Sequence, residues 1–136
     1  MTRMIEKVSR WTRNQKNKSV GYAGAHISAD FWHGENITSC KLLESLLIQA
    51  SKAARATPLE VVSHVFSPHG ITGVVLLSES HIAIHTWPEI GYTAVDIFTC
   101  GKKAKPREAL KFLKNILKPK KIKITEMKRG KWEKEE

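Results

Sequence analysis

The chain has 136 residues, of which 41% are hydrophobic, and this size suits one domain with a modest core. No apolar run approaches the roughly 20 residues that span a bilayer, and residues 1–18 lack the apolar segment of a secretory signal. We therefore expect a cytoplasmic protein that does not enter the membrane. Cys40 and Cys100 are expected to be reduced, because cytosolic chains of this size seldom depend on disulfides and two thiols alone make no zinc site.

The net charge of +10 is divided unevenly along the chain. Residues 1–18 hold six Lys or Arg and one acidic residue, and residues 102–136 hold fourteen and five. The middle segment, 19–101, holds three basic and seven acidic residues, and is mildly acidic. Basic ends suggest a nucleic-acid-binding module, but no aromatic residues alternate with the basic ones in a stacking pattern. The acidic middle favours a cationic small molecule over a phosphate backbone, so nucleic acid is not the expected partner.

The first predicted elements are an arm, a strand and a helix. Residues 1–18 show no sustained period and predict a basic N-terminal arm. Gly21 to Phe31 alternates in the manner of a strand. Thr38 or Ser39 is the expected cap of a helix that runs to about Ala56, with leucine and alanine at three-to-four spacing along one face.

Three β-rich segments follow this helix, approximately from Leu59 to Phe66, Thr72 to Leu77 and Ile82 to Trp87. Tyr92 to Thr99 then alternates in the manner of another strand. Pro106 opens a second amphipathic helix, and Lys118-Pro119 ends it because the residue before a proline disfavours helical dihedrals. Ile122 and Ile124 alternate with lysines and predict a last strand.

These elements predict an α+β fold. The expected architecture is a two-layer sandwich, a mainly antiparallel sheet with two helices on one face. The domain is expected to cover residues 19–129, with residues 130–136 as a charged C-terminal tail. The second face of such a sheet is left without cover, which favours a homodimer.

Two segments carry the distinctive chemistry, Ser78-Glu79-Ser80-His81-Ile82-Ala83-Ile84-His85-Thr86-Trp87-Pro88-Glu89 and Asp96-Ile97-Phe98-Thr99-Cys100-Gly101. A serine can attack the carbonyl carbon before it, so that the amide becomes an ester, and β-elimination then breaks the chain. Hydrolysis of the resulting dehydroalanine leaves a ketone. The reaction needs a strained turn, hydrogen-bond donors for the oxyanion and a base that takes the α-proton of the serine. Ser80 fits as the serine, His85 as the base and Thr72 as a hydroxyl donor.

A ketone at a new N-terminus has a use in decarboxylation. It condenses with a substrate amine to form a Schiff base, which is an electron sink, so neither a diffusible cofactor nor a metal is required. Cys100 is the candidate acid that reprotonates the α-carbon. Each residue also has a simpler interpretation: Ser80 as a turn residue, His85 as a half-buried histidine, Cys100 as a small core residue. Strict alternation puts Ser80 and His85 on opposite sheet faces, so a bend or bulge at Ser80 is expected.

Both segments resemble the prokaryotic S-adenosylmethionine decarboxylases, and the resemblance covers about residues 21–129. It implies self-cleavage between Glu79 and Ser80, giving a β chain of residues 1–79 and an α chain of residues 80–136. The α chain would begin with a covalent pyruvoyl group made from Ser80.

The resemblance also implies the roles of single residues. It implies that His85 acts in processing and that Thr72 supplies a processing hydroxyl, where relatives often carry serine. It implies that Cys100 is the proton donor in decarboxylation. Phe66 and Trp87 match positions that hold the adenine and sulfonium against aromatic faces, and Glu89 matches an acid that binds the ribose hydroxyls.

The implied activity is decarboxylation of S-adenosylmethionine, which makes the aminopropyl donor for spermidine. Gly24-Ala25-His26 stands where many relatives have Gly-Arg/Lys-His. A pyruvoyl-dependent arginine or ornithine decarboxylase on the same scaffold therefore stays open as the alternative.

Overall fold

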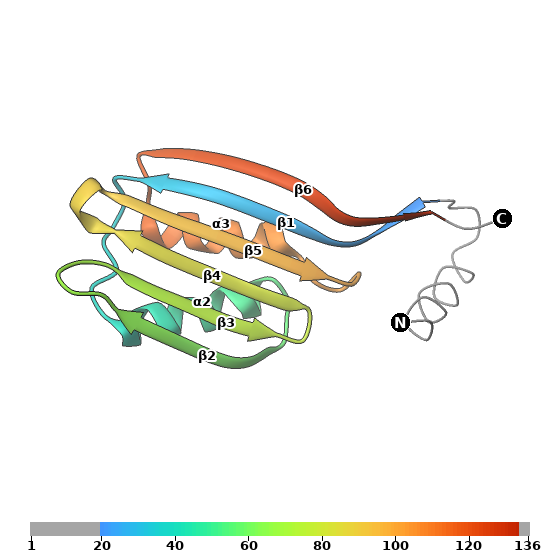
Figure 1. Cartoon of the computed structure of the whole chain (residues 1–136), viewed down its shortest axis with the longest axis horizontal. Coiled ribbons are helices and arrows are strands. Elements are labelled where there is room, and N and C mark those ends of the chain that lie inside the picture. Colours follow the sequence, from blue (N-terminus) through green and yellow to red (C-terminus); the bar gives the residue numbers. More distant parts are fainter. Residues whose placement is uncertain (1–19, 134–136) are drawn as a thin grey trace.

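The computed structural model describes residues 20–133, which form one antiparallel sheet with two helices against a single face (Figure 1). The elements are β1 (Val20–Trp32), α2 (Cys40–Ala53), β2 (Pro58–Val65), β3 (Ile71–Leu77), β4 (Ser80–Trp87), the 3₁₀ helix η1 (Pro88–Ile90), β5 (Tyr92–Cys100), α3 (Pro106–Leu117) and β6 (Lys121–Glu133). The strands lie in the order β2-β3-β4-β5-β1-β6. The predicted α+β class is confirmed. The arm predicted for residues 1–18 lies outside the described residues.

The helix ends follow the local sequence. Ser39 caps α2, since its hydroxyl oxygen accepts a hydrogen bond of 3.1 Å from the Leu42 N–H. The helix ends at Ala53, three residues before the predicted end, and Arg55 follows with a left-handed φ of 55°. Pro106 opens α3 as predicted, and Lys118 ends it in the left-handed region with a φ of 46°.

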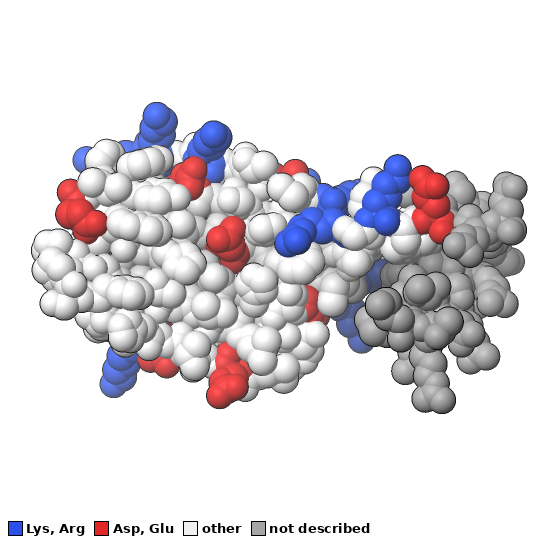
Figure 2. All heavy atoms as spheres, in the orientation of Figure 1, with Lys and Arg blue, Asp and Glu red and all other residues white. Residues whose placement is uncertain are grey.

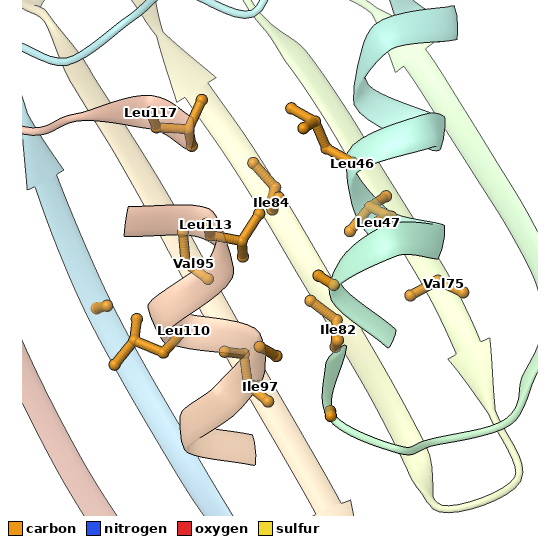
Figure 3. Close-up of a cluster of buried hydrophobic side chains, with 14 of the residues drawn as sticks. Leu46, Leu47, Val75, Ile82, Ile84, Val95, Ile97, Leu110, Leu113 and Leu117 are labelled. Carbon is orange, nitrogen blue, oxygen red and sulfur yellow. The ribbon is translucent and has the colours of Figure 1, made fainter. Parts of the chain in front are cut away.

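The core lies between the helices and the sheet (Figure 3). Leucines of α2 and α3 face alternate apolar residues of β3, β4 and β5. The labelled side chains are Leu46, Leu47, Val75, Ile82, Ile84, Val95, Ile97, Leu110, Leu113 and Leu117, and all are buried. Each such side chain contributes about 1.5–3 kcal/mol when it leaves water. Gly73 lets α2 lie close to β3, because a Cβ there would meet Leu43 Cδ2 at 2.7 Å.

The opposite face of the sheet carries no helix within residues 20–133, and we call it the open face (Figure 1). Since Ile82, Ile84 and Thr86 of β4 are buried against the helices, the alternate side chains of this strand point to the open face. Cross-strand pairing extends the face to the neighbouring strands. Its side chains include His26, Asp30, Trp32, Thr72, His81, His85, Trp87, Tyr92, Asp96 and Phe98.

The first residues of β1 and the last residues of β6 form a two-stranded ribbon beyond the end of β5 (Figure 1). β6 continues past Arg129, where the sequence analysis ended the domain, because β1 is long enough to pair with it as far as Glu133. Lys and Arg side chains gather on this ribbon (Figure 2). Lys128 lies over the ring of Tyr22 at 5.5 Å, and the Arg129 guanidinium lies over the ring of Phe98 at 4.8 Å.

Candidate active site

Ser80 occupies a strained position at the start of β4. Ser78 and Glu79 form a two-residue turn, and Leu77 pairs with Ser80 across it. Ser80 has a φ of 136°, which L-residues seldom adopt and which costs about 1–3 kcal/mol. The ladders on both sides of β4 show no register shift, so the departure from regular strand geometry is a change of dihedral and not a bulge.

The peptide bond before Ser80 is held from two sides. The Glu79 carbonyl oxygen accepts a hydrogen bond of 2.8 Å from the backbone N–H of Cys100. The Glu79 carboxylate accepts a bond of 2.7 Å from the Thr57 N–H and one of 3.4 Å from the Thr57 hydroxyl. A donor on this carbonyl stabilises the negative charge that develops on its oxygen when a nucleophile attacks the carbon.

The Ser80 hydroxyl contacts a histidine that the sequence analysis did not select. Ser80 Oγ lies 3.2 Å from Nδ1 of His81, and the His81 ring meets Phe98 edge-on with centroids 6.0 Å apart. Adjacency to Ser80 was the only sequence feature that could have indicated His81. Successive residues of a regular strand point to opposite faces, so this contact depends on the unusual φ of Ser80.

The two predicted processing residues Thr72 and His85 contact each other. They are direct cross-strand neighbours, and Thr72 Oγ1 lies 3.0 Å from His85 Nδ1. His85 nevertheless lies on the same strand as Ser80, and at about 3.3 Å per residue their Cα atoms are roughly 16 Å apart. Within one chain, the structure therefore does not bring His85 to Ser80.

An aromatic stack lies at the far end of β4. The Trp87 ring stacks on Tyr92 with centroids 5.2 Å apart, and Tyr92 stacks on Trp32 at 4.6 Å. The Tyr92 hydroxyl donates a short hydrogen bond to the Asp30 carboxylate. Burial, followed by the bond to Asp30, raises the pKa of Tyr92 to about 12. Trp87 stays 41% exposed and can offer its surface to a ligand.

The other predicted binding residues lie at this same end. Phe66 follows β2 and is 49% exposed, and its ring meets that of His64 edge-on at 4.7 Å. Glu89 is exposed in η1, directly after Trp87. These positions are where strands β2 and β4 end, next to the beginning of β3.

The predicted residues thus fall into two groups at opposite ends of the sheet. The processing end holds Glu79, Ser80 and Cys100, because Thr99 pairs with Ser80. The aromatic end holds the others, Phe66, Thr72, His85, Trp87 and Glu89. Along β4, about 23 Å separate Ser80 from Trp87 at about 3.3 Å per residue.

Among residues 20–133, no group of His, Cys, Asp and Glu side chains is arranged to hold a metal ion. No helix in that range has the length and apolar character that crossing a membrane requires.

Comparison with known proteins agrees with the motifs. Residues 25–130 match the family model of S-adenosylmethionine decarboxylase. The S-adenosylmethionine decarboxylase proenzyme of Methanococcus maripaludis strain C7 is 47% identical over 109 residues, 79% of this chain and 89% of the relative. The S-adenosylmethionine decarboxylase proenzyme of Acetivibrio thermocellus is 45% identical over 112 residues, which are 81% of this chain and 90% of the relative.

A solved structure extends the similarity to three dimensions. The crystal structure of the adenosylmethionine decarboxylase from Aquifex aeolicus VF5 matches with a TM-score of 0.78 and 40% identity, over 85% of this chain and 97% of that one. Fold and motifs together define the chain as a carboxy-lyase. It belongs to the S-adenosylmethionine decarboxylase family, as the resemblance of its motifs predicted.

Proposed function

We propose that this chain is a cytoplasmic proenzyme that cleaves itself between Glu79 and Ser80 and then decarboxylates S-adenosylmethionine. The product is the aminopropyl donor for spermidine. The observation that carries the proposal is the strained Ser80, whose preceding carbonyl already accepts a hydrogen bond from Cys100. The names of the relatives add support, since they describe those proteins as proenzymes of this decarboxylase.

The residues at the processing end fit the formation of a pyruvoyl group. Ser80 supplies the hydroxyl, and strain at its backbone lowers the barrier to leaving the ground-state geometry. The Cys100 N–H is positioned to stabilise the oxyanion on Glu79. The pyruvoyl ketone supplies an electrophilic carbon and an electron sink for decarboxylation. Cys100, at the same end, is the proposed donor of the proton to the α-carbon.

Substrate binding is proposed for the aromatic end. Trp87 and Phe66 present exposed rings that attract a sulfonium and stack on adenine. Glu89 is proposed to accept hydrogen bonds from the ribose hydroxyls.

The separation of the two ends favours an active site built from two copies of the chain. A substrate on Trp87 lies about 23 Å from Ser80 of the same chain at about 3.3 Å per residue, too far for one small molecule. Two chains that stack their open faces about a two-fold axis running across the strands place the aromatic end of one over the processing end of the other. Exposed apolar side chains on that face, such as Val62 and Leu76, favour such a contact. We therefore propose a homodimer with two shared sites, in which His85 serves Ser80 of the partner.

An intact-mass spectrum tests the processing, together with carbon dioxide release from S-adenosylmethionine, arginine and ornithine. We expect two fragments, residues 1–79 and a ketone-bearing 80–136, and release from S-adenosylmethionine alone. Ser80→Ala is expected to stay one inactive chain, and Ser80→Cys to cleave more slowly. An uncleaved wild type that is active would contradict the mechanism. Release from arginine or ornithine in place of S-adenosylmethionine would contradict the substrate.

Mixed dimers test the shared site. Ser80→Ala inactivates the processing end, and Trp87→Ala inactivates the aromatic end. Co-expression of the two variants with different affinity tags yields heterodimers with one site built from two intact ends. The mixture is then expected to regain up to about a quarter of wild-type activity, since half of the dimers are mixed and each has one competent site. Isolated heterodimers without activity would contradict a shared site.

A further inference from the structure

A histidine other than His85 lies within hydrogen-bond distance of the Ser80 hydroxyl. Nδ1 of His81 is 3.2 Å from Ser80 Oγ, whereas His85 is engaged with Thr72 at 3.0 Å and lies about 16 Å from Ser80 in its own chain. A nucleophilic hydroxyl with an imidazole nitrogen at this distance is the arrangement that activates a serine. His81 thus meets the geometric requirement without help from a second chain.

The contact also gives a reason for the strained backbone. In a regular strand, the side chains of residues 80 and 81 would point to opposite faces of the sheet. The φ of 136° at Ser80 reorients this residue, and its hydroxyl meets the imidazole that follows. Strain at a functional residue persists where the surroundings enforce it, and here the Glu79 carbonyl and carboxylate are both held by neighbouring strands and loops.

Packing fixes the His81 ring. It is half-buried and meets Phe98 edge-on at 6.0 Å with an interplanar angle of 65°. Phe98 is itself held by the ring of His26, 5.7 Å away, and by the Arg129 guanidinium at 4.8 Å. The orientation of Nδ1 toward Ser80 is therefore supported by three rings and one guanidinium, which come from β4, β5, β1 and β6.

We infer that His81 is the base of the first step of self-cleavage, a proposal that rests on the processing function proposed above. As Ser80 Oγ bonds to the Glu79 carbonyl carbon, the hydroxyl proton passes to His81 Nδ1, and the Cys100 N–H stabilises the carbonyl oxygen. The bond between that carbon and the Ser80 nitrogen then breaks, and the nitrogen takes the proton from His81. An ester and a free amine result, and His81 is neutral again. Removal of the Ser80 α-proton is a later, separate step, which is the one assigned to His85.

Two substitutions separate a base from a residue that only orients the serine. His81→Ala removes both the acceptor and the base. In His81→Asn, an amide oxygen takes the place of Nδ1 and still accepts a hydrogen bond, but it takes up no proton at neutral pH. We expect both variants to cleave about 10²- to 10⁴-fold more slowly than wild type in a timed cell-free translation. His69→Asn, in the exposed turn before β3, is the matched control and is expected to cleave at the wild-type rate.

Hydroxylamine identifies the blocked step, because it cleaves an ester and not an amide. His85→Ala precursor is expected to hold the ester and to be split by hydroxylamine at residue 80. His81→Asn is expected to resist, like Ser80→Ala. Cleavage of His81→Asn at the wild-type rate, or its splitting by hydroxylamine, would overturn the inference. If the alanine variant fails to fold, the asparagine variant carries the test, with its circular dichroism compared with that of Ser80→Ala. A wild type that never cleaves would instead overturn the proposed function.

Discussion

The backbone N–H of Cys100 donates a hydrogen bond of 2.8 Å to the carbonyl oxygen of Glu79. This bond joins the end of β5 to the turn before β4, and it belongs to the backbone. Changing the Cys100 side chain therefore leaves the donor to the Glu79 carbonyl in place. The two proposed contributions of Cys100, its N–H in cleavage and its thiol in decarboxylation, can be separated by mutation.

Cys100→Ala is accordingly expected to cleave but to decarboxylate poorly. In the proposed mechanism, the proton from the thiol is needed only after carbon dioxide leaves, and loss of a general acid costs about 10²- to 10⁴-fold in rate. Gel analysis of cleavage and carbon dioxide release from S-adenosylmethionine measure the two steps. Full turnover by the alanine variant would show that another group is the acid.

Thr72→Val is expected to slow self-cleavage, because it removes the hydroxyl that bonds to His85 at 3.0 Å. A hydrogen bond of this kind contributes about 1 kcal/mol, or about five- to tenfold in rate. Thr72→Ser keeps the hydroxyl and is the matched control, with cleavage close to wild type in a timed gel assay. Equal rates for the valine and serine variants would exclude a role for the hydroxyl.

Glu89→Gln is expected to cleave itself normally but to have a lower kcat/KM for S-adenosylmethionine. Loss of the proposed charge-assisted bonds to two ribose hydroxyls is expected to cost on the order of 1.5–3 kcal/mol, or roughly ten- to a hundredfold in kcat/KM. Steady-state kinetics measure this loss. Glu108→Gln, exposed on α3 on the other side of the sheet, is the control and should keep wild-type kinetics. An unchanged kcat/KM for Glu89→Gln would remove the ribose contact from the mechanism.

Tyr92 is expected to ionise late in an alkaline titration. Its pKa is raised from 10.0 to about 12, so the unfolded chain loses this proton at lower pH than the folded one. The stability that Tyr92 contributes is complete below pH 10.0 and is lost as the pH rises to about 12. The difference between wild type and Tyr92→Phe, in tyrosinate absorbance and in urea unfolding at several pH values, isolates this group. A tyrosinate signal with its midpoint near pH 10.0 would contradict the bond to Asp30.

Leu47→Ala is expected to lower the free energy of unfolding by about 2–5 kcal/mol, because the side chain is fully buried under the sheet. Leu42 lies on the same helix but is 41% exposed, so Leu42→Ala is the matched control and should cost much less. Urea unfolding monitored by circular dichroism compares the two. Equal losses would mean that the core does not lie on this face of α2.

Local patterns in the sequence determined the elements and led to the predicted chemistry. Periodicity of apolar residues predicted both helices and some of the strands, and β-rich composition predicted the others. Thr38 or Ser39 and Pro106 marked the helix starts, because capping and proline act within one turn. The family, and the choice of Ser80, His85 and Cys100, came from short segments in which these residues keep a fixed spacing. Such properties depend on near neighbours in the chain, and a sequence displays them directly.

Only the tertiary structure decided which residues meet. β1 lies between β5 and β6 in the sheet. This order brings Asp30 of β1 next to Tyr92 of β5, although the two residues lie far apart in the sequence. The register of β4 with β5 sets the Cys100 N–H on the Glu79 carbonyl, and the dihedral at Ser80 turns its hydroxyl to His81. Register and backbone strain are set by the packing of the whole sheet against its helices, so the partners of Ser80 could not be predicted from its sequence neighbours.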